Sequence, residues 1–131
     1  MIISLIIYGG NLLGYDPNSL KTYFNEIQGL KFCFDINHAI KAAISKNINY
    51  IVFIKEFLKF KRPDLFHISG GNLDIEIDEH LSLDKGKYNL FEIKKVLLNY
   101  NSIINLTFET PRNYERRIQD DLNNIKIFLK S

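Results

Sequence analysis

Four strand-sized apolar segments, separated by longer amphipathic stretches, constrain the fold of this 131-residue chain more than any other feature. The segments are rich in Ile, Phe and Leu and cover residues 2–8, 30–36, 64–69 and 103–109. Strands that alternate with helices pair in parallel and are covered by those helices. We therefore predict one α/β domain over residues 1–131, with four consecutive βα units and helices on the outer face of a parallel sheet.

The stretches between the strands carry helical signals of their own. A capping aspartate followed by proline, Asp16-Pro17, is typical of a helix start. Residues 50–54 also have strand composition, so their assignment to a helix depends on the apolar spacing that follows them. The predicted helices cover residues 16–27, two pieces within 37–62, residues 88–100, and a last segment after Pro111 with Tyr114, Ile118, Leu122, Ile125 and Leu129 on one face.

The number of units is half that of a closed barrel. A TIM barrel of eight βα units takes ~250 residues, whereas four units account for the 131 residues here. The predicted architecture is therefore half of a TIM-type (β/α)8 barrel. Such a sheet cannot close on itself, and its first and last strands would present unpaired backbone groups. We expect these edges to be covered by a second copy, giving a homodimer, or by a complementary N-terminal half-barrel chain; a truncated or degenerate product is the third alternative.

Ionisable residues lie near the C-terminal ends of three predicted strands, on the face opposite the bulky apolar residues. They are Asp35, His67 and Glu109. Ligands bind at this end of parallel α/β sheets, so we expect the three side chains to converge. One imidazole and two carboxylates suit Zn²⁺, with Mn²⁺ or Fe²⁺ as alternatives, and a cation would relieve the repulsion between the acids. The other interpretation is that each is a separately satisfied polar group.

The two remaining histidines also have acidic neighbours. His38 follows Asp35 by three residues, and His80 follows Asp78 by two. In an extended chain, residues 78 and 80 project to the same side and can share one ion. None of the three histidines is therefore isolated from a carboxylate, which strengthens the prediction of a metal site.

These segments resemble, in order and spacing, the C-terminal half of the endonuclease IV and xylose isomerase-like TIM barrels, the AP endonuclease family 2 superfamily. The resemblance rests on residues 33–39 (CFDINHA), 65–69 (LFHIS), 78–81 (DEHL) with Gly86, and 106–111 (LTFETP). It implies two sets of zinc ligands, one formed by Asp35, His67 and Glu109 and the other by His38, Asp78 and His80.

The resemblance also implies a metal-dependent phosphodiester hydrolase that acts on abasic DNA once the barrel is completed. Sugar isomerases and epimerases of the same superfamily use a single ion, and a non-catalytic metal-binding subunit or remnant is a further alternative. The Asp78-x-His80 pair favours the endonuclease branch, because the epimerases tend to have an arginine nearby instead. Two positions depart from the pattern: Tyr8 stands where a metal-bridging glutamate is expected, and Ser69 is followed by glycines rather than an aspartate.

Charge and composition decide less. Seventeen Lys and Arg against fifteen Asp and Glu leave a net charge of +2, which argues for neither a nucleic-acid nor a membrane partner. A single cysteine suits a reducing cytoplasm, and the apolar residues 1–7 indicate a buried strand rather than a signal peptide or membrane span. Two basic clusters could contact DNA phosphates: Lys55, Lys59, Lys61 and Arg62, and Arg112, Arg116 and Arg117. Solvated helix faces explain both clusters equally well.

Overall fold

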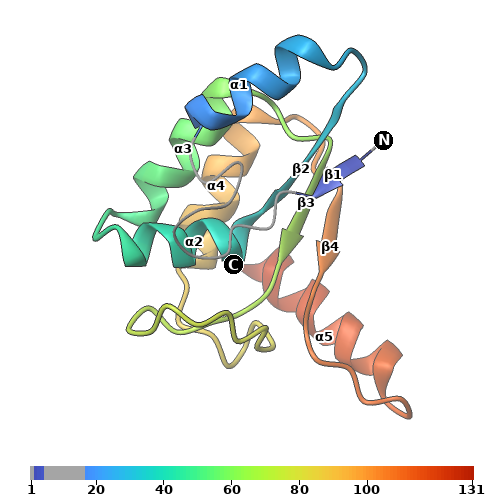
Figure 1. Ribbon diagram of the computed structural model, residues 1–131. Coiled ribbons are helices and arrows are strands. Elements are labelled where there is room, and N and C mark those ends of the chain that lie inside the picture. Colours follow the sequence, from blue (N-terminus) through green and yellow to red (C-terminus); the bar gives the residue numbers. More distant parts are fainter. Residues whose placement is uncertain (1, 5–16) are drawn as a thin grey trace.

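A parallel sheet forms the centre of the computed structural model, which describes residues 2–4 and 17–131. Its four strands follow the chain in the order β1-β2-β3-β4. In Figure 1, helices α1 to α4 lie on one side of the sheet and α5 lies beyond β4. The predicted α/β class with parallel pairing is confirmed. The strands are β1 (Ile2–Ser4), β2 (Lys31–Asp35), β3 (Leu65–Ile68) and β4 (Leu106–Phe108).

The predicted helices are all present in the described residues. They are α1 (Pro17–Glu26), α2 (Ile36–Ser45), α3 (Tyr50–Phe60), α4 (Leu90–Tyr100) and α5 (Arg117–Lys130). The ambiguous residues 50–54 are helical, because Asn49 caps the backbone N–H groups of Ile51 and Val52 at 3.0 and 3.1 Å. Their strand-like composition reflects the deep burial of one face of α3, where Ile54 is fully covered.

The observed strands are shorter than predicted: β2 and β3 begin one residue later and β4 three residues later than expected, and each ends one residue earlier. Ile36 was expected in the second strand but is the first residue of α2, because Asp35 ends β2 and caps the helix at once. The first strand was expected to reach Tyr8; residues 5–16, which include Tyr8, lie outside the described part of the chain.

The core forms between the sheet and α1 to α4. Phe32, Phe34, Phe66 and Ile68 alternate along β2 and β3 and are almost completely buried. The rings of Phe34 and Phe66 pack edge to face with centroids 6.3 Å apart. This packing leaves the opposite face of the same strands to carry Asp35 and His67, as the alternation predicted.

Helix α5 leaves exposed the apolar side chains whose spacing predicted it. Asn124 and Phe128 face the core, with the Phe128 ring 6.2 Å from that of Phe108 on β4. Tyr114 was expected on this helix but precedes it, because α5 begins at Arg117. The rest of the apolar stripe used for the prediction is exposed: Ile118 (69%), Leu122 (43%), Ile125 (38%) and Leu129 (69%). The helix was therefore predicted correctly, but among residues 2–4 and 17–131 most of its apolar face has no cover. Among the described residues, no helix has the length and apolarity to cross a membrane.

Candidate metal centre

Asp35, His67 and Glu109 meet at the C-terminal edge of the sheet. Asp35 and His67 are register partners on β2 and β3. Glu109 follows β4 directly, and its backbone N–H donates to the carbonyl of Ile68 at 2.8 Å. His67 Nδ1 lies 2.8 Å from Glu109 Oε1 and 3.9 Å from Asp35 Oδ2. The predicted convergence is observed, and one ligand atom from each residue lies within 4.8 Å of the others.

Asp35 serves the backbone and the site at once. Its Oδ1 accepts the backbone N–H of His38 at 2.9 Å, which caps α2. Its Oδ2 faces the imidazoles of His38 and His67. Burial raises the pKa of this carboxyl, and the charge of His38 and its backbone N–H offset only part of that effect. A cation beside Asp35 would favour its ionised form.

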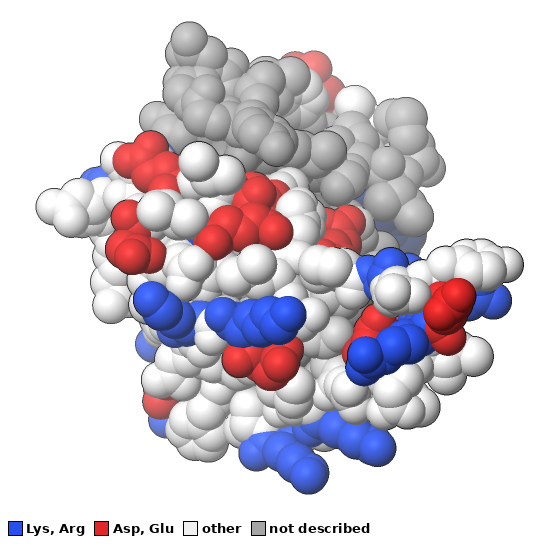
Figure 2. All heavy atoms as spheres, turned by 90° about the horizontal axis from the view of Figure 1, so that it is seen from below, with Lys and Arg blue, Asp and Glu red and all other residues white. Residues whose placement is uncertain are grey.

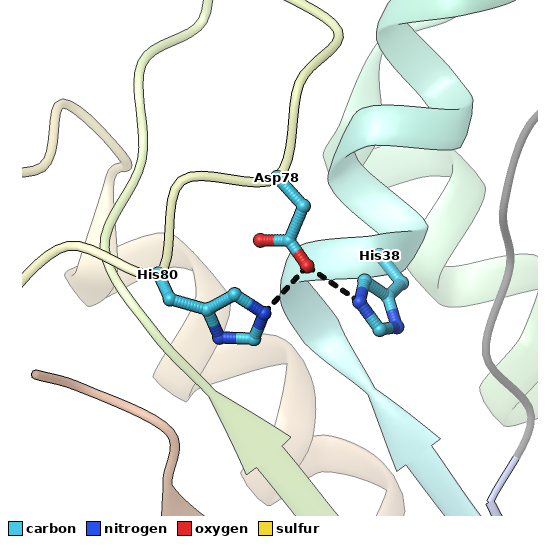
Figure 3. A group of neighbouring side chains, drawn as sticks. All are labelled: His38, Asp78 and His80. Atoms are coloured by element: carbon cyan, nitrogen blue, oxygen red, sulfur yellow. Dashed lines mark hydrogen bonds and ion pairs between the residues drawn. The ribbon is translucent and has the colours of Figure 1, made fainter.

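His38, Asp78 and His80 form a second group around one oxygen atom. Asp78 Oδ2 lies 2.6 Å from His38 Nε2 and 2.7 Å from His80 Nε2 (Figure 3). His38 comes from the first turn of α2, whereas Asp78 and His80 come from the loop after β3. His80 has a φ of 45°, in the left-handed region that few non-glycine residues adopt. This backbone turn accompanies the placement of both loop side chains at one point.

The carboxylate and the buried imidazole of this group stabilise each other's charge. Burial opposes the charged form of His38, but the hydrogen bond with Asp78 and the charges of Asp35 and Asp78 outweigh it and raise the pKa of His38. Burial likewise opposes ionisation of Asp78, but His38 and His80 outweigh it and lower the pKa of Asp78. The ionised carboxylate therefore accepts a hydrogen bond from His38 Nε2, and the same oxygen lies 2.7 Å from His80 Nε2.

The two groups are neighbours. His38 Nδ1 lies 3.3 Å from Asp35 Oδ2. His80 Nδ1 lies 3.1 Å from the backbone carbonyl of Glu109 and 3.8 Å from its Oε2. Each histidine of the second group therefore directs its other ring nitrogen toward a residue of the first. The six residues singled out from the sequence form one continuous cluster.

The donor atoms fit a divalent cation. Each group combines imidazole nitrogen with carboxylate oxygen, the mixed set found in catalytic zinc sites with three protein ligands. His38 Nε2 and His80 Nε2 both contact one oxygen, Asp78 Oδ2, so the ligand atoms of the second group lie close together. Mn²⁺ is also compatible with such donors.

The residues that hold the loop around the second group were not predicted from the sequence. Lys41 is buried and donates to the carbonyls of Asn72 and Ile75 at 2.7 and 3.0 Å, and to Glu79 at 3.2 Å. Asn37 donates to Asp78, and Tyr88 donates to Asn37. Of these, Asn37 and Glu79 stood inside quoted motifs, directly before His38 and directly after Asp78, and their residue types gave no signal of this role.

The surface at this end of the molecule has an uneven charge distribution. Figure 2 shows Asp and Glu side chains across the upper half of the view, with most Lys and Arg side chains below them. Lys59 pairs with Glu56 at 2.8 Å, and Arg112 pairs with Asp121 at 2.9 Å. Phe57, which lies between the basic residues of α3, is buried and offers no surface for stacking. DNA contact through these clusters stays a prediction.

Fold and site together define a class of protein: an α/β chain with the architecture of part of a TIM barrel, carrying two groups that can hold a metal ion. Among solved structures it is similar to a D-tagatose 3-epimerase-like protein, with 22% identity and a TM-score of 0.57. The similarity covers 95% of this chain but 45% of that chain, so this chain spans less than half of its neighbour's length. No protein-family model and no curated protein matches the sequence. The similarity shows the fold and agrees with a partial barrel.

Proposed function

We propose that this chain binds divalent metal ions, Zn²⁺ or alternatively Mn²⁺. Once its barrel is completed, it acts as a metal-dependent phosphodiester hydrolase on abasic DNA. The observation that carries the proposal is the second group, in which His38 Nε2 and His80 Nε2 both contact Asp78 Oδ2. A single-ion site formed by Asp35, His67 and Glu109 would not require this arrangement. Two adjacent groups suit two-metal displacement at a phosphate.

The proposed chemistry follows from the charges of the cluster. Three carboxylates, from Asp35, Asp78 and Glu109, would repel a phosphate. When bound, divalent ions would reverse this charge, polarise a phosphate oxygen and lower the pKa of a water molecule. His38 and His67 would position the ions through their ring nitrogens, because the buried ends of a helix and a strand hold both side chains in place.

A sugar isomerase or epimerase is the second candidate function. It is supported by the fold similarity to the D-tagatose 3-epimerase-like protein. In this case Asp35, His67 and Glu109 would suffice for a single ion, and the second group would contact substrate or serve only as structure.

Metal content tests the binding proposal. Elemental analysis of the purified protein should find about one to two equivalents of zinc or manganese per chain. The metal should be lost on dialysis against a chelator and return on readdition, while circular dichroism follows the fold. A well-folded protein that neither contains nor takes up metal would end both candidate functions.

Substrate class is tested on the metal-loaded protein, alone and with any chain that completes the barrel. Incision of a duplex with one abasic site supports the hydrolase, provided that the same duplex without the lesion stays intact. Epimerisation of a ketose with no incision supports the second candidate. Metal binding with neither activity would favour a non-catalytic subunit.

A second copy of the chain is the partner that we propose for the exposed edge. Strand β4 has no neighbour beyond it among the described residues, and the stripe of Ile118, Leu122, Ile125 and Leu129 on the adjacent helix lacks a cover. The similar D-tagatose 3-epimerase-like protein is more than twice as long as the part that this chain matches. Two copies about a two-fold axis would supply eight parallel strands and place each β4 beside the partner's β1.

Light scattering tests this association. The purified chain should show twice its mass of 15.3 kDa. Leu122→Arg should halve that mass by placing a charge on the stripe, whereas Gln119→Arg on the polar face of α5 should leave it unchanged. A wild-type mass of one chain at every concentration would overturn the second copy as partner; assembly only with a complementary half-barrel chain would identify that chain instead.

A further inference from the structure

The geometry points to a positioning role for two residues outside the ligand set: Tyr88 and Asn37 form a hydrogen-bond chain that fixes which oxygen of Asp78 faces His38 and His80. This inference rests on the proposed metal binding for its functional meaning. The hydrogen-bond chain itself is a property of the metal-free protein and can be tested there.

The hydrogen-bond chain from Tyr88 to Asp78 runs through the interior of the protein. The Tyr88 hydroxyl donates to Asn37 Oδ1, and Asn37 Nδ2 donates to Asp78 Oδ1. The other oxygen of Asp78 is left for the two imidazoles, at 2.6 and 2.7 Å. Asn37 is 1% exposed and Tyr88 is 7% exposed. Bulk water therefore cannot easily reach these side chains and replace their hydrogen-bond partners.

The donor and acceptor roles leave little choice of direction. An ionised carboxylate only accepts hydrogen bonds, so Asp78 requires the nitrogen end of the Asn37 amide. The amide oxygen must then face Tyr88, whose hydroxyl has to donate. Burial, followed by the charges of Asp78 and Glu79, raises the pKa of Tyr88, which keeps the hydroxyl protonated.

The backbone around Gly71 holds Tyr88 in reach of Asn37. The N–H of Lys87 donates to the carbonyl of Gly71 at 2.8 Å, which brings the segment before α4 back to the end of β3. A Cβ at Gly71 would collide with the Tyr88 hydroxyl and lie 3.2 Å from Asn37 Oδ1. Gly71 therefore leaves room for the hydrogen bond between Tyr88 and Asn37. It is one of the glycines that follow Ser69, where the family that the sequence resembles has an aspartate.

The consequence for a bound ion is a fixed ligand orientation. With Oδ1 of Asp78 held by Asn37, only Oδ2 is directed at the point shared with His38 and His80. Without the Tyr88 hydroxyl, the Asn37 amide is free to rotate and present oxygen to the carboxylate. Loss of such outer partners typically weakens metal binding about 10–100-fold.

The experiment compares Tyr88→Phe with Tyr50→Phe in the full chain. The Tyr50 ring lies 6.4 Å from that of Tyr88, and its hydroxyl accepts from the backbone of Asn89, so the control removes the same atom nearby without touching Asp78. Zinc titration against a chelating indicator should show one equivalent bound about 10-fold more weakly in Tyr88→Phe, with the other equivalent and Tyr50→Phe unchanged. Asn37→Asp, which puts an acceptor against Asp78, should weaken the same equivalent about 100-fold.

Nitrogen NMR of the metal-free protein provides the second measurement, because the chain has three histidines. Tyr88→Phe and Asn37→Asp should shift the imidazole signals of His38 and His80 and leave those of His67 in place. If the wild type binds zinc while both variants bind it as tightly with unchanged signals, the positioning role is overturned. If the wild type binds no zinc, the proposed function fails, and the imidazole signals still decide whether the hydrogen-bond chain orients Asp78.

Discussion

Replacing Asp78 by alanine is expected to remove one metal equivalent and spare the other, whereas His67→Ala is expected to do the reverse. Asp78 supplies the single oxygen that both His38 Nε2 and His80 Nε2 contact, so its loss reduces the second group to two imidazoles. His67 bridges the space between Asp35 and Glu109 in the first group. Because removal of an outer partner alone costs about 10–100-fold, loss of a direct ligand should weaken its own site by at least about 100-fold.

The measurement is zinc stoichiometry and affinity for each variant, with thermal unfolding of the metal-free proteins as a check on folding. Asp74→Ala is the matched control, because Asp74 is an exposed acid of the same loop and is absent from both candidate groups. It should bind zinc like the wild type. Equal losses from Asp74→Ala and Asp78→Ala would mean that general acidity, rather than the group around Asp78, attracts the ion.

Truncation of Phe66 to alanine should lower the free energy of unfolding by about 3–5 kcal/mol. The side chain is fully buried in β3 and packs edge to face on Phe34 of β2. Its neighbour His67 points to the opposite face, so the same strand carries the core and the candidate site. Loss of the ring should therefore loosen the frame that aligns Asp35 with His67.

Denaturant unfolding of the metal-free chain measures this effect. Phe91→Ala is the matched control, because Phe91 lies on α4 with 57% of its surface exposed. That substitution should change stability by no more than about 0.5 kcal/mol. Similar losses from both substitutions would contradict the described packing of β2 against β3.

Much of the fold was predictable because its signals are local. Apolar alternation in residues 64–69 predicted β3, and Asp16-Pro17 predicted the start of α1. The convergence of Asp35, His67 and Glu109 was also predictable, because parallel strands end at a common edge and side chains alternate across each strand. Two short-range rules were therefore enough to bring together residues that are far apart in the chain.

Helix α5 shows the limit of such reasoning. Its periodicity correctly indicated a helix, yet Ile118 and Leu129 are exposed while Asn124 is buried. Asn124 faces inward because its side chain accepts the backbone N–H of Leu83 at 2.8 Å and donates to Thr110 at 3.2 Å. Amphipathic spacing indicates that one side of a helix is apolar, but it does not say which chain covers that side.

The sequence by itself determined the class of fold and the strand-end positions of three candidate ligands, because periodicity and parallel pairing act through near neighbours. Only the tertiary structure decided how Asp78 and His80 return to His38, and how Asn37 and Tyr88 orient the carboxylate between them. The physical reason is that these contacts depend on the path of the loop after β3. That path is set by backbone hydrogen bonds such as Lys87 to Gly71, for which no periodic pattern exists.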